Sequence, residues 1–596
     1  MTDYTAPLRD MRFAIAKLAG LADIIALPGY EDTTPDLVDA VLEEAAKLAA
    51  DVLSPLNVSG DRQGARLGPN GVVAADGFGA AYQRFIENGW GSVSGDPEFG
   101  GQGLPNLVST AVAEMWNSAN MAFALCPTLT IGAMEAIRAH ASDELKAVYL
   151  PKLISGEWTG TMNLTEPQAG SDLAAVRTRA VPDGSQYRIH GQKIFITWGD
   201  HDMTENVVHL VLARLPDSPE GVKGISLFLV PKFLVNEDGT LGARNDAHCT
   251  ALEHKLGIHA SPTCVMSFGE GEGAIGYLVG DVNCGVANMF TMMNEARQKV
   301  GLQGLAVAER AYQAARAYAG ERVQGRPVGQ KAGDRVAIIH HPDVRRMLLT
   351  MKSQIEAMRG FAYVMATDID IAHRHPDAAE RQNRQAQVDL LTPVLKGWCT
   401  ELGVEISSLA IQVYGGMGFI EETGAAQYLR DSRIAPIYEG TTGIQAADLV
   451  GRKLPMLKGA PMAALIAGMR ATGAEMAAVA DPAFATIAKN FAVALDALEQ
   501  TSAWVLQNLA ANPAAALAAS VNFMMLIGYA VGGWHLARAA LAARDALAEE
   551  PEEPFYQAKI TTAAFYAEQL LPRVASLAAS VQYGSSFAEQ LPVDQF

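Results

Sequence analysis

Hydrophobic residues recur at helical spacing through the N-terminal part of the chain. Between residues 34 and about 140, apolar side chains lie three or four positions apart, as at Val38, Val41 and Leu42, which predicts amphipathic helices. The stretch 91–103 (GSVSGDPEFGGQG) breaks this pattern and is typical of a loop.

In the middle of the chain, hydrophobic and polar residues alternate, as they do in strands. Residues 186–197 (QYRIHGQKIFIT) alternate around a His-Gly pair, which predicts a turn at that pair. Residues 207–214 (VVHLVLAR) and 224–230 (GISLFLV) follow as strands bounded by Pro, Gly or Asp. We therefore expect a β domain of the sandwich or barrel type.

The pattern becomes helical again from Val286. Long amphipathic runs cover residues 287–322, 341–373, 383–414 and 441–456. An Ala-rich helical region follows Lys458 and is joined through a Lys-Gly-Ala-Pro linker. The expected fold class is α+β multidomain: an N-terminal helical domain (1–159), a β domain (160–282), a helical bundle (283–457) and an appended helical domain (458–596).

One uncharged segment raises the question of a membrane span. No Asp, Glu, Lys or Arg occurs between Glu499 and Arg538, and a spanning helix needs about 20 apolar residues. The segment is rich in Ala and Gly, contains Ser520 and Asn522, and has no basic flank on its N-terminal side. We interpret it as a helix buried in a bundle, with membrane association as the alternative.

Composition limits the function classes. Hydrophobic residues make up 49% of the 596 residues, which permits several buried cores, and the net charge of -19 argues against nucleic-acid binding. The five cysteines are scattered without C-x-x-C spacing, which fits a reducing cytoplasm and no structural metal site. The N-terminus carries early acids and no long apolar run, so it does not resemble a signal peptide.

Two segments carry candidate chemistry. Glu439 lies between an aromatic residue and a Gly-Thr-Thr turn, where a carboxylate can be a helix cap or a catalytic base. The loop 162–172 (MNLTEPQAGSD) offers N–H groups and hydroxyls to a polar ring edge or a phosphate, although such residues also form ordinary turns. No G-x-G-x-x-G follows a strand, so a Rossmann NAD site is not supported.

Five motifs occur in an order that resembles the acyl-CoA dehydrogenase family. They are residues 162–172, 191–199 (GQKIFITWG), 321–325 (ERVQG), 412–419 (QVYGGMGF) and 437–442 (IYEGTT). The resemblance covers roughly residues 80–455. Segments 4–13 and 253–264 and the appended C-terminal helices are similar to a longer bacterial branch of that family. The resemblance implies the domain order given above and FAD as cofactor.

Glu439 matches the family's catalytic base. It would remove a proton from the carbon next to the thioester carbonyl while a hydride leaves the next carbon for flavin N5. A carboxylate in apolar surroundings is a stronger base, and we expect Ile437 and Tyr438 to supply that lining. In the family, the thioester oxygen accepts hydrogen bonds from the base's own backbone N–H and from a flavin ribityl hydroxyl, and losing such a donor costs about 3 kcal/mol.

The resemblance also implies cofactor contacts. Met162, Leu164 and Thr165 match positions beside the flavin ring. Phe195 and Thr197 match the strand that covers the flavin's other side, although Phe195 can also be read as core packing.

The remaining implied cofactor residues lie in the C-terminal half. Arg322 and Gln324 match an arm that reaches the FAD of a neighbouring subunit, because an Arg fork suits a pyrophosphate. Gln412, Gly415 and Gly416 match the loop over the adenosine end. Thr441 follows the base at a helix N-terminus.

Three residues match substrate positions. Ser171 matches a position near the CoA arm, although it can also be a turn former. Arg297 matches a substrate-side position, and Asn294 stands where many relatives carry Asp. Gly443 stands where many relatives have Gln, which removes one possible flavin contact.

The implied activity is the dehydrogenation of an acyl-CoA to the trans-2-enoyl-CoA, with electrons passed to an electron-transfer flavoprotein by a dimer or tetramer. The longer branch favours 3-(methylthio)propanoyl-CoA as substrate. Medium- or long-chain fatty acyl-CoA and an acyl-CoA oxidase are alternatives. Some flavoproteins of this fold bind DNA through a basic C-terminal domain, but six basic against twelve acidic residues follow Lys458 here.

Overall fold

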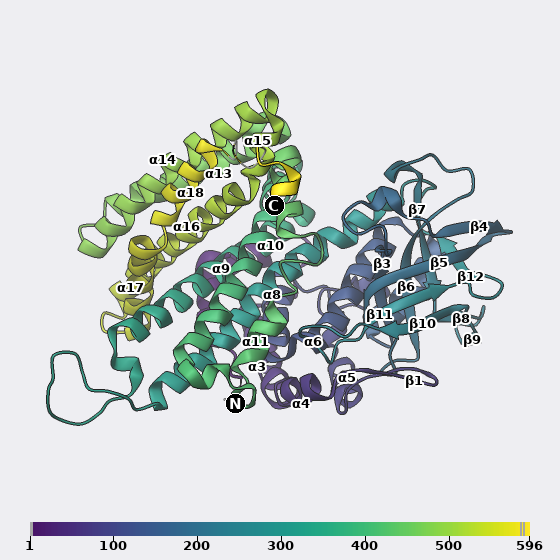
Figure 1. The fold of residues 1–596 in the computed structure, drawn as a ribbon, viewed down its shortest axis with the longest axis horizontal. Helices are drawn as coiled ribbons and strands as arrows, with labels where there is room; N and C mark the ends of the chain where they lie inside the picture. The colour runs from purple at the N-terminus through teal and green to yellow at the C-terminus, as the bar shows by residue number, and fades with distance from the viewer. Residues whose placement is uncertain (1–3, 585–586, 588–589) are drawn as a thin grey trace. The chain divides into compact units, whose positions relative to one another are not determined.

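The chain forms two compact units in the computed structural model, which describes residues 4–584, 587 and 590–596 (Figure 1). The helical unit comprises Met1–Glu43, Pro105–Glu114 and Val300–Phe596, and the sheet unit comprises Glu44–Leu104 and Met115–Lys299. The division into four domains stays a prediction.

The sheet unit is built on eight hydrogen-bonded strands. These are β3 (Trp158–Asn163), β4 (Arg179–Asp183), β5 (Gln186–Thr197), β6 (Asn206–Arg214), β7 (Ile225–Pro231), β10 (Ala247–Leu252), β11 (Thr263–Phe268) and β12 (Ala274–Leu278). Their order is β10-β11-β5-β12-β7-β6-β3, and β4 pairs with both β5 and β6. Strands β5, β12, β7, β6 and β4 therefore close a ring, as in a small barrel. The predicted strands 207–214 and 224–230 are confirmed as β6 and β7.

Strand β5 differs from its prediction. The turn expected at His190-Gly191 is wrong, because residues Gln186–Thr197 form one continuous strand. Its first half pairs with β4 and β12, and its second half leaves the ring to pair with β11. A glycine is needed at position 191 because of close packing and not because of a turn, since a Cβ there would lie 2.4 Å from the Thr178 hydroxyl oxygen.

Helices in the sheet unit follow the predicted pattern with one interruption. The elements are α4 (Pro55–Gln63), the hairpin strands β1 (Arg66–Gly68) and β2 (Gly71–Val73), α5 (Phe78–Glu87) and α7 (Asp143–Ser155). The hairpin was not predicted, because each strand is only three residues long and shows no alternation. Helix α6 (Asn106–His140) contributes residues to both units.

Helix α6 also has a membrane-like composition. Among the residues described, it is the one helix long and apolar enough to cross a membrane, and 89% of its apolar stretch is buried within the structure.

Long helices dominate the helical unit and confirm the predicted runs. They include α8 (Gly285–Glu321, shared with the sheet unit), α9 (Pro342–Arg374) and α10 (Ala378–Tyr414), and the shorter α11 (Ala425–Ser432) and α12 (Thr442–Asp448) follow. The fourth predicted run, 441–456, is confirmed only in part, because α12 gives way to a π-helix at Leu449–Lys453. Asp377 caps α10 by accepting a hydrogen bond from the N–H of Ala379, 2.8 Å away. Helix α9 begins with Pro342 and is buried along most of its length.

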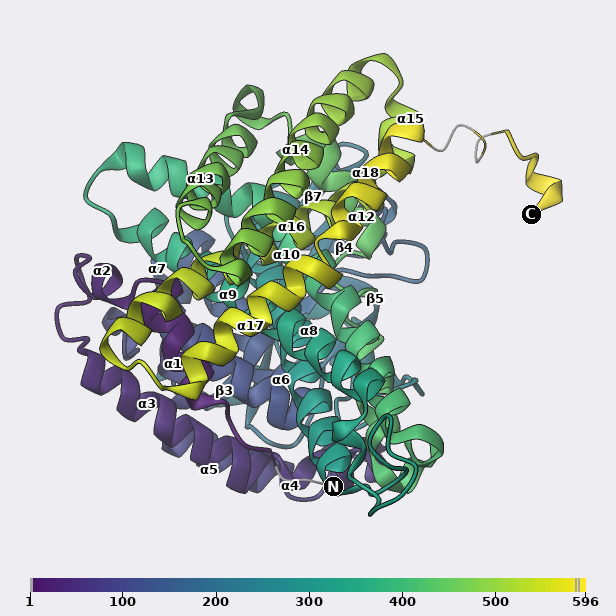
Figure 2. The same ribbon diagram turned by 90° about the vertical axis from the view of Figure 1, so that its left-hand side faces the viewer.

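The appended C-terminal helices form a bundle on α9 and α10. They are α13 (Ala460–Ala477), α14 (Pro482–Ala511), α15 (Pro513–Ala518), α16 (Ser520–Glu549), α17 (Pro554–Gln569) and α18 (Pro572–Tyr583). Helix α16 lies between α9, α10, α14, α17 and α18, so it is enclosed by other helices (Figure 2). The prediction of a buried bundle helix is confirmed for the part of the uncharged segment that α16 contains.

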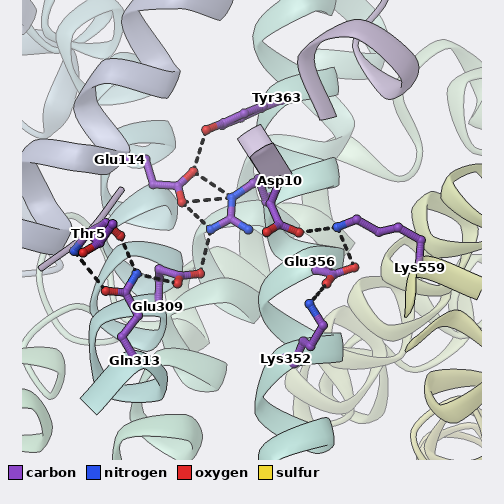
Figure 3. Close-up of polar contacts among 10 residues, drawn as sticks. Thr5, Asp10, Glu114, Glu309, Gln313, Lys352, Glu356, Tyr363 and Lys559 are labelled. Atoms are coloured by element: carbon purple, nitrogen blue, oxygen red, sulfur yellow. Dashed lines mark hydrogen bonds and ion pairs between the residues drawn. The ribbon is translucent and has the colours of Figure 1, made fainter. Parts of the chain in front are cut away.

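Buried ion pairs connect several of these helices (Figure 3). Arg359 of α9 is 2% exposed, and its Nη2 lies 2.6 Å from Oε1 of Glu114 and 2.8 Å from Oε2 of Glu309. The Tyr363 hydroxyl donates to Glu114 over 2.7 Å. One guanidinium therefore pairs with two buried carboxylates that come from α6 and α8.

A second buried cation joins the appended bundle to the N-terminal segment. Lys559 of α17 is 4% exposed and forms an ion pair with Glu356 of α9 at 3.1 Å. It also contacts Asp10 in α1 (Leu8–Phe13) (Figure 3). Burial alone would raise the pKa of Asp10, but the charges of Lys559, Lys352 and Arg359 lower it to about 2.

Candidate active site

Glu439 lies in a sharp turn in the helical unit. It has φ +56°, and the following Gly440 has φ +89°, so two successive residues adopt the left-handed region. That conformation costs a non-glycine residue about 1 kcal/mol or more, and it recurs at functional sites. A Cβ at position 440 would lie 2.7 Å from Nε2 of Gln445, so the amide that holds the Glu439 carbonyl would have to shift.

Two buried donors hold the carbonyls of this turn. Nζ of Lys396, from α10, donates to the Gly440 carbonyl over 2.7 Å. Nε2 of Gln445, from α12, donates to the Glu439 carbonyl over 3.0 Å. Both side chains are fully buried, so water does not compete for these hydrogen bonds. The backbone at Glu439 is therefore fixed from two helices.

Residues on either side of Glu439 are fixed as well. The Tyr438 hydroxyl donates to Oε1 of Gln303, and burial, followed by the charge of Glu439, raises the pKa of this phenol. Thr442 donates its hydroxyl hydrogen to Glu401 over 2.6 Å. Ile437 is 47% exposed in the helical unit, so it is not a buried lining residue there.

The helix-cap interpretation of Glu439 does not hold. The N-cap of α12 is Thr441, whose hydroxyl oxygen accepts a hydrogen bond from the N–H of Ile444 over 3.2 Å. Glu439 lies two residues earlier. Glu439 is therefore not the N-cap residue of α12, and its catalytic role stays a prediction.

In the sheet unit, the loop after β3 is held by a buried ion pair. Nζ of Lys193 in β5 lies 2.8 Å from Oε1 of Glu166 and donates to the Leu164 carbonyl over 2.9 Å. The side chains are 0% and 3% exposed, respectively. Glu166 also accepts hydrogen bonds from the N–H groups of Arg177 and Thr178, 2.7 and 3.0 Å away. The pair fixes the backbone on both sides of Thr165.

A β-bulge displays Phe195. In the β5–β11 ladder, Cys264 is paired with Ile196 and Met266 with Lys193, so Val265 faces two residues of β5. Phe195 has φ +60° and its side chain is 58% exposed. The core-packing interpretation of Phe195 is wrong for the sheet unit, since the ring points to the surface. The N–H of Ile194 leaves the ladder and donates to the Thr165 carbonyl over 2.9 Å.

The other predicted residues of the sheet unit differ in exposure. Leu164 is 9% exposed, Met162, Thr165 and Thr197 are half-buried, and Ser171 is exposed. Arg297 of α8 is 6% exposed, with its guanidinium 5.8 Å from the ring centroid of Phe290. Asn294 is half-buried one turn earlier in the same helix.

The predicted residues of the helical unit other than Glu439 lie at its surface. Arg322 and Gln324 are exposed in an arm whose backbone pairs with residues 336–338. Gln412, Gly415 and Gly416 are exposed at the end of α10. An added Cβ at either glycine would meet no atom within 4 Å, so neither glycine is required by packing inside this unit.

Sequence reasoning missed the residues that support the site. Lys193 and Glu166 stand inside the recognised motifs and Gln445 stands just after one, whereas Lys396 lies outside them, and none of the four was singled out. A usable signal existed for the two lysines. Each lies in a strand or helix of mostly apolar residues, where a buried lysine requires a partner.

Acid should reveal the contribution of the Glu166 carboxylate. Burial alone would raise its pKa, but Lys193 and the hydrogen bonds lower it from 4.5 to about 2. The folded pKa lies below the unfolded one, so this stability is present above pH 4.5 and lost as pH falls towards 2. We expect Glu166→Gln to lower the free energy of unfolding at neutral pH by about 3 kcal/mol, measured by urea denaturation. The difference in this free energy between wild type and variant should become smaller in acid.

The exposed Glu205→Gln is the matched control and should change little at either pH. A gap between wild type and Glu166→Gln that stays constant down to about pH 3 would show that the carboxylate does not carry this stability.

Family models match four consecutive parts of the chain. They are described as Acyl-CoA dehydrogenase, N-terminal domain (residues 39–157), middle domain (161–270) and C-terminal domain (283–454), and as Acetyl-CoA dehydrogenase C-terminal like (465–592). The last model falls on the appended helices.

Whole-length relatives were also found. The chain is 49% identical over 569 residues to the 3-methylmercaptopropionyl-CoA dehydrogenase of Ruegeria pomeroyi, covering 95% of this chain and 96% of that protein. It is 37% identical over 616 residues to a butyryl-CoA dehydrogenase of Syntrophomonas wolfei, covering 100% and 99%. Among solved structures, Caenorhabditis elegans ACDH-11 in complex with C11-CoA has the same fold, with a TM-score of 0.78 at 21% identity, covering 96% of this chain and 93% of that one.

Proposed function

Because the chain belongs to the acyl-CoA dehydrogenase family, and is thereby an FAD-dependent oxidoreductase, we propose that Glu439 is the base that removes the α-proton of its acyl-CoA substrate. One observation carries this assignment. Glu439 is a carboxylate in a left-handed turn whose carbonyls are held by buried Lys396 and Gln445. A base must keep its position as the proton transfers, and buried donors supply that rigidity.

The chemistry of the surrounding residues fits FAD. Phe195 presents a flat aromatic ring at the surface of the sheet unit, which suits packing against an isoalloxazine. Met162, Leu164, Thr165 and Thr197 are proposed to contact the same ring.

The polar end of FAD is proposed to contact exposed residues of the helical unit. Arg322 would pair with the pyrophosphate of a neighbouring subunit's cofactor, together with Gln324. Gln412, Gly415 and Gly416 would approach the adenosine end, where an exposed glycine backbone allows close contact. Thr441 is proposed to contact FAD as well, while its hydroxyl oxygen caps α12.

In the proposed mechanism, the residues of this chain orient the thioester and move one proton. Glu439 takes the α-proton, and its own N–H donates to the thioester oxygen as negative charge develops there. FAD, when bound, supplies the acceptor for the hydride from the β-carbon. Ser171, Asn294 and Arg297 are proposed to contact the substrate. The product is the trans-2-enoyl-CoA.

We further propose 3-(methylthio)propanoyl-CoA as the substrate, an electron-transfer flavoprotein as electron acceptor, a dimer or tetramer as the assembly and the cytoplasm as the compartment. The relative of 49% identity, which bears the name 3-methylmercaptopropionyl-CoA dehydrogenase, supports the substrate. The butyryl-CoA dehydrogenase of 37% identity keeps a short straight-chain acyl-CoA as the second candidate.

A panel of thioesters with a dye acceptor under anaerobic conditions tests the substrate. The decisive comparison is 3-(methylthio)propanoyl-CoA with pentanoyl-CoA, because the two chains have equal length and differ only in sulfur for methylene. We expect kcat/KM to be highest for the thioether, above pentanoyl-, butyryl- and palmitoyl-CoA. A higher kcat/KM for palmitoyl-CoA would overturn the substrate assignment. Peroxide formed at the turnover rate on re-aeration would indicate an oxidase.

A further inference from the structure

A cavity of about 890 Å³ lies where the appended helices meet the rest of the helical unit. Its walls come from the N-terminal segment, α9, α10, α13 and α16, and the turn before α13 lies at its rim. All of these elements belong to the helical unit. The volume is in the range of small-molecule sites, roughly 300–1,000 Å³. No residue assigned above to FAD or substrate lines this cavity.

One wall is aromatic and fixed. The His535 ring stacks between Phe361, at 5.9 Å and 24°, and Trp534, at 5.3 Å and 29°. The indole N–H of Trp534 donates to the Thr472 hydroxyl oxygen over 2.8 Å, which locks the ring orientation. Such a wall offers a flat apolar surface to a ligand.

The same wall carries a cation without a carboxylate partner. Arg538 lies 5.4 Å from the Trp534 ring centroid, and it donates to the Leu18 carbonyl over 2.7 Å and to Nδ1 of His535 over 3.4 Å. Burial, followed by the charge of Arg538, lowers the pKa of His535, so the neutral ring accepts this hydrogen bond. Within the part of the chain that the structure describes, no carboxylate lies within ion-pair distance of Arg538.

The acidic residues around the cavity are otherwise engaged. Arg384 pairs with Asp368 at 2.9 Å and with Glu380 at 2.7 Å. Asp23, which also lines the cavity, is exposed to solvent, as is Lys17. Burial lowers the pKa of Arg538 and the charge of Asp368 raises it, so Asp368 acts on this guanidinium from beyond ion-pair distance. Among the described cations in the interior of the cavity, Arg538 is the one without a directly paired carboxylate.

The rim of the cavity is strained. Leu457 and Lys458 adopt left-handed conformations, with φ +49° and +58°, although neither is glycine. Leu457 lines the cavity while its side chain is 67% exposed. Successive residues in this region are costly and are found at ligand clamps and switch regions. The strained turn is also the link that joins the bundle to the appended helices.

We propose that this cavity is a second binding site, which takes an amphipathic organic anion with a carboxylate head and an apolar body. The carboxylate pairs with the Arg538 guanidinium, whose fork suits two carboxylate oxygens. The apolar body lies along Trp534 and the leucines of α10 and α13. The site is independent of Glu439 and of the acyl-CoA reaction.

Decanoate and decanol are the probes, titrated calorimetrically into the full-length FAD-loaded protein with the acyl-CoA site saturated by an enoyl-CoA. We expect decanoate to bind at least about tenfold more tightly than decanol. Arg538→Gln should raise the Kd of decanoate by about tenfold and leave the Kd of decanol unchanged. Arg544→Gln, an exposed arginine of the same helix, should leave both unchanged.

A blocking variant keeps the test decisive if Arg538→Gln fails to fold. Ala464 lines the cavity and is exposed, so a tryptophan there should fill the cavity without disturbing the core. We expect Ala464→Trp to raise the Kd of decanoate by about tenfold. Its neighbour Ala463 is exposed but does not line the cavity, so Ala463→Trp should bind like wild type. No decanoate binding to wild type, or equal binding to the two tryptophan variants, would overturn the proposal.

Discussion

Replacing Glu439 with Gln is expected to abolish the reduction of bound flavin by acyl-CoA while leaving the protein yellow. The amide keeps the size of the side chain but cannot accept the α-proton, and losing a general base costs about 10²–10⁴ in rate. The turn should persist, because Lys396 and Gln445 hold its backbone carbonyls and not the carboxylate. Anaerobic stopped-flow mixing with substrate measures flavin bleaching, and the visible spectrum measures FAD content.

Glu422→Gln is the matched control, because this glutamate is exposed and lies in a neighbouring turn of the same unit. It should reduce flavin at the wild-type rate. If Glu439→Gln retained more than about a tenth of the wild-type reduction rate, another residue would have to be the base. Loss of FAD from Glu439→Gln would instead assign the carboxylate a structural role.

Replacing Arg359 with Met is expected to destabilise the helical unit severely. The variant would leave Glu114 and Glu309 buried and close together without a counter-charge, and breaking a buried ion pair from one side costs about 3–5 kcal/mol. Two carboxylates are affected here, so the upper end of that range is expected. The measurement is the midpoint of the first cooperative urea transition, followed by far-UV circular dichroism.

Arg346→Met, on the same helix, provides the comparison. This arginine is 51% exposed and pairs with an exposed Asp343, so its loss should change the unfolding free energy by at most about 0.5 kcal/mol. An Arg359→Met midpoint close to that of Arg346→Met would show that the guanidinium contributes little to the stability of the helical unit.

Local sequence patterns predicted most helices and strands but not the points where distant segments touch. The long helical runs that became α8, α9 and α10 are visible in the local sequence, although α10 begins five residues before its predicted run. At Gly191 the same approach failed, because the glycine serves a close contact with Thr178 and not a turn. A contact of that kind depends on the pairing of β4 with β5, which no local window contains.

The same limit applied to the site. A family resemblance singled out Glu439, but the residues that fix its turn come from α10 and α12. Lys396 is 43 residues before Glu439 in the sequence, and whether its side chain reaches the Glu439 turn depends on how α10 packs. The exposure of Phe195 was equally hidden, since the bulge that turns its ring outward arises from the register between β5 and β11.

The ion pair between Lys559 and Asp10 joins residues 549 positions apart. During synthesis, the N-terminal helix leaves the ribosome long before its buried counter-charge exists. Glu356 pairs with the same ammonium group in addition to Lys352 of its own helix, so the contact that joins the first helix, α9 and α17 can form only when α17 has been translated. Nascent chains arrested before that point should leave the surface around Asp10 open to chaperones and proteases, and a late step of folding should bring α17 against the first helix.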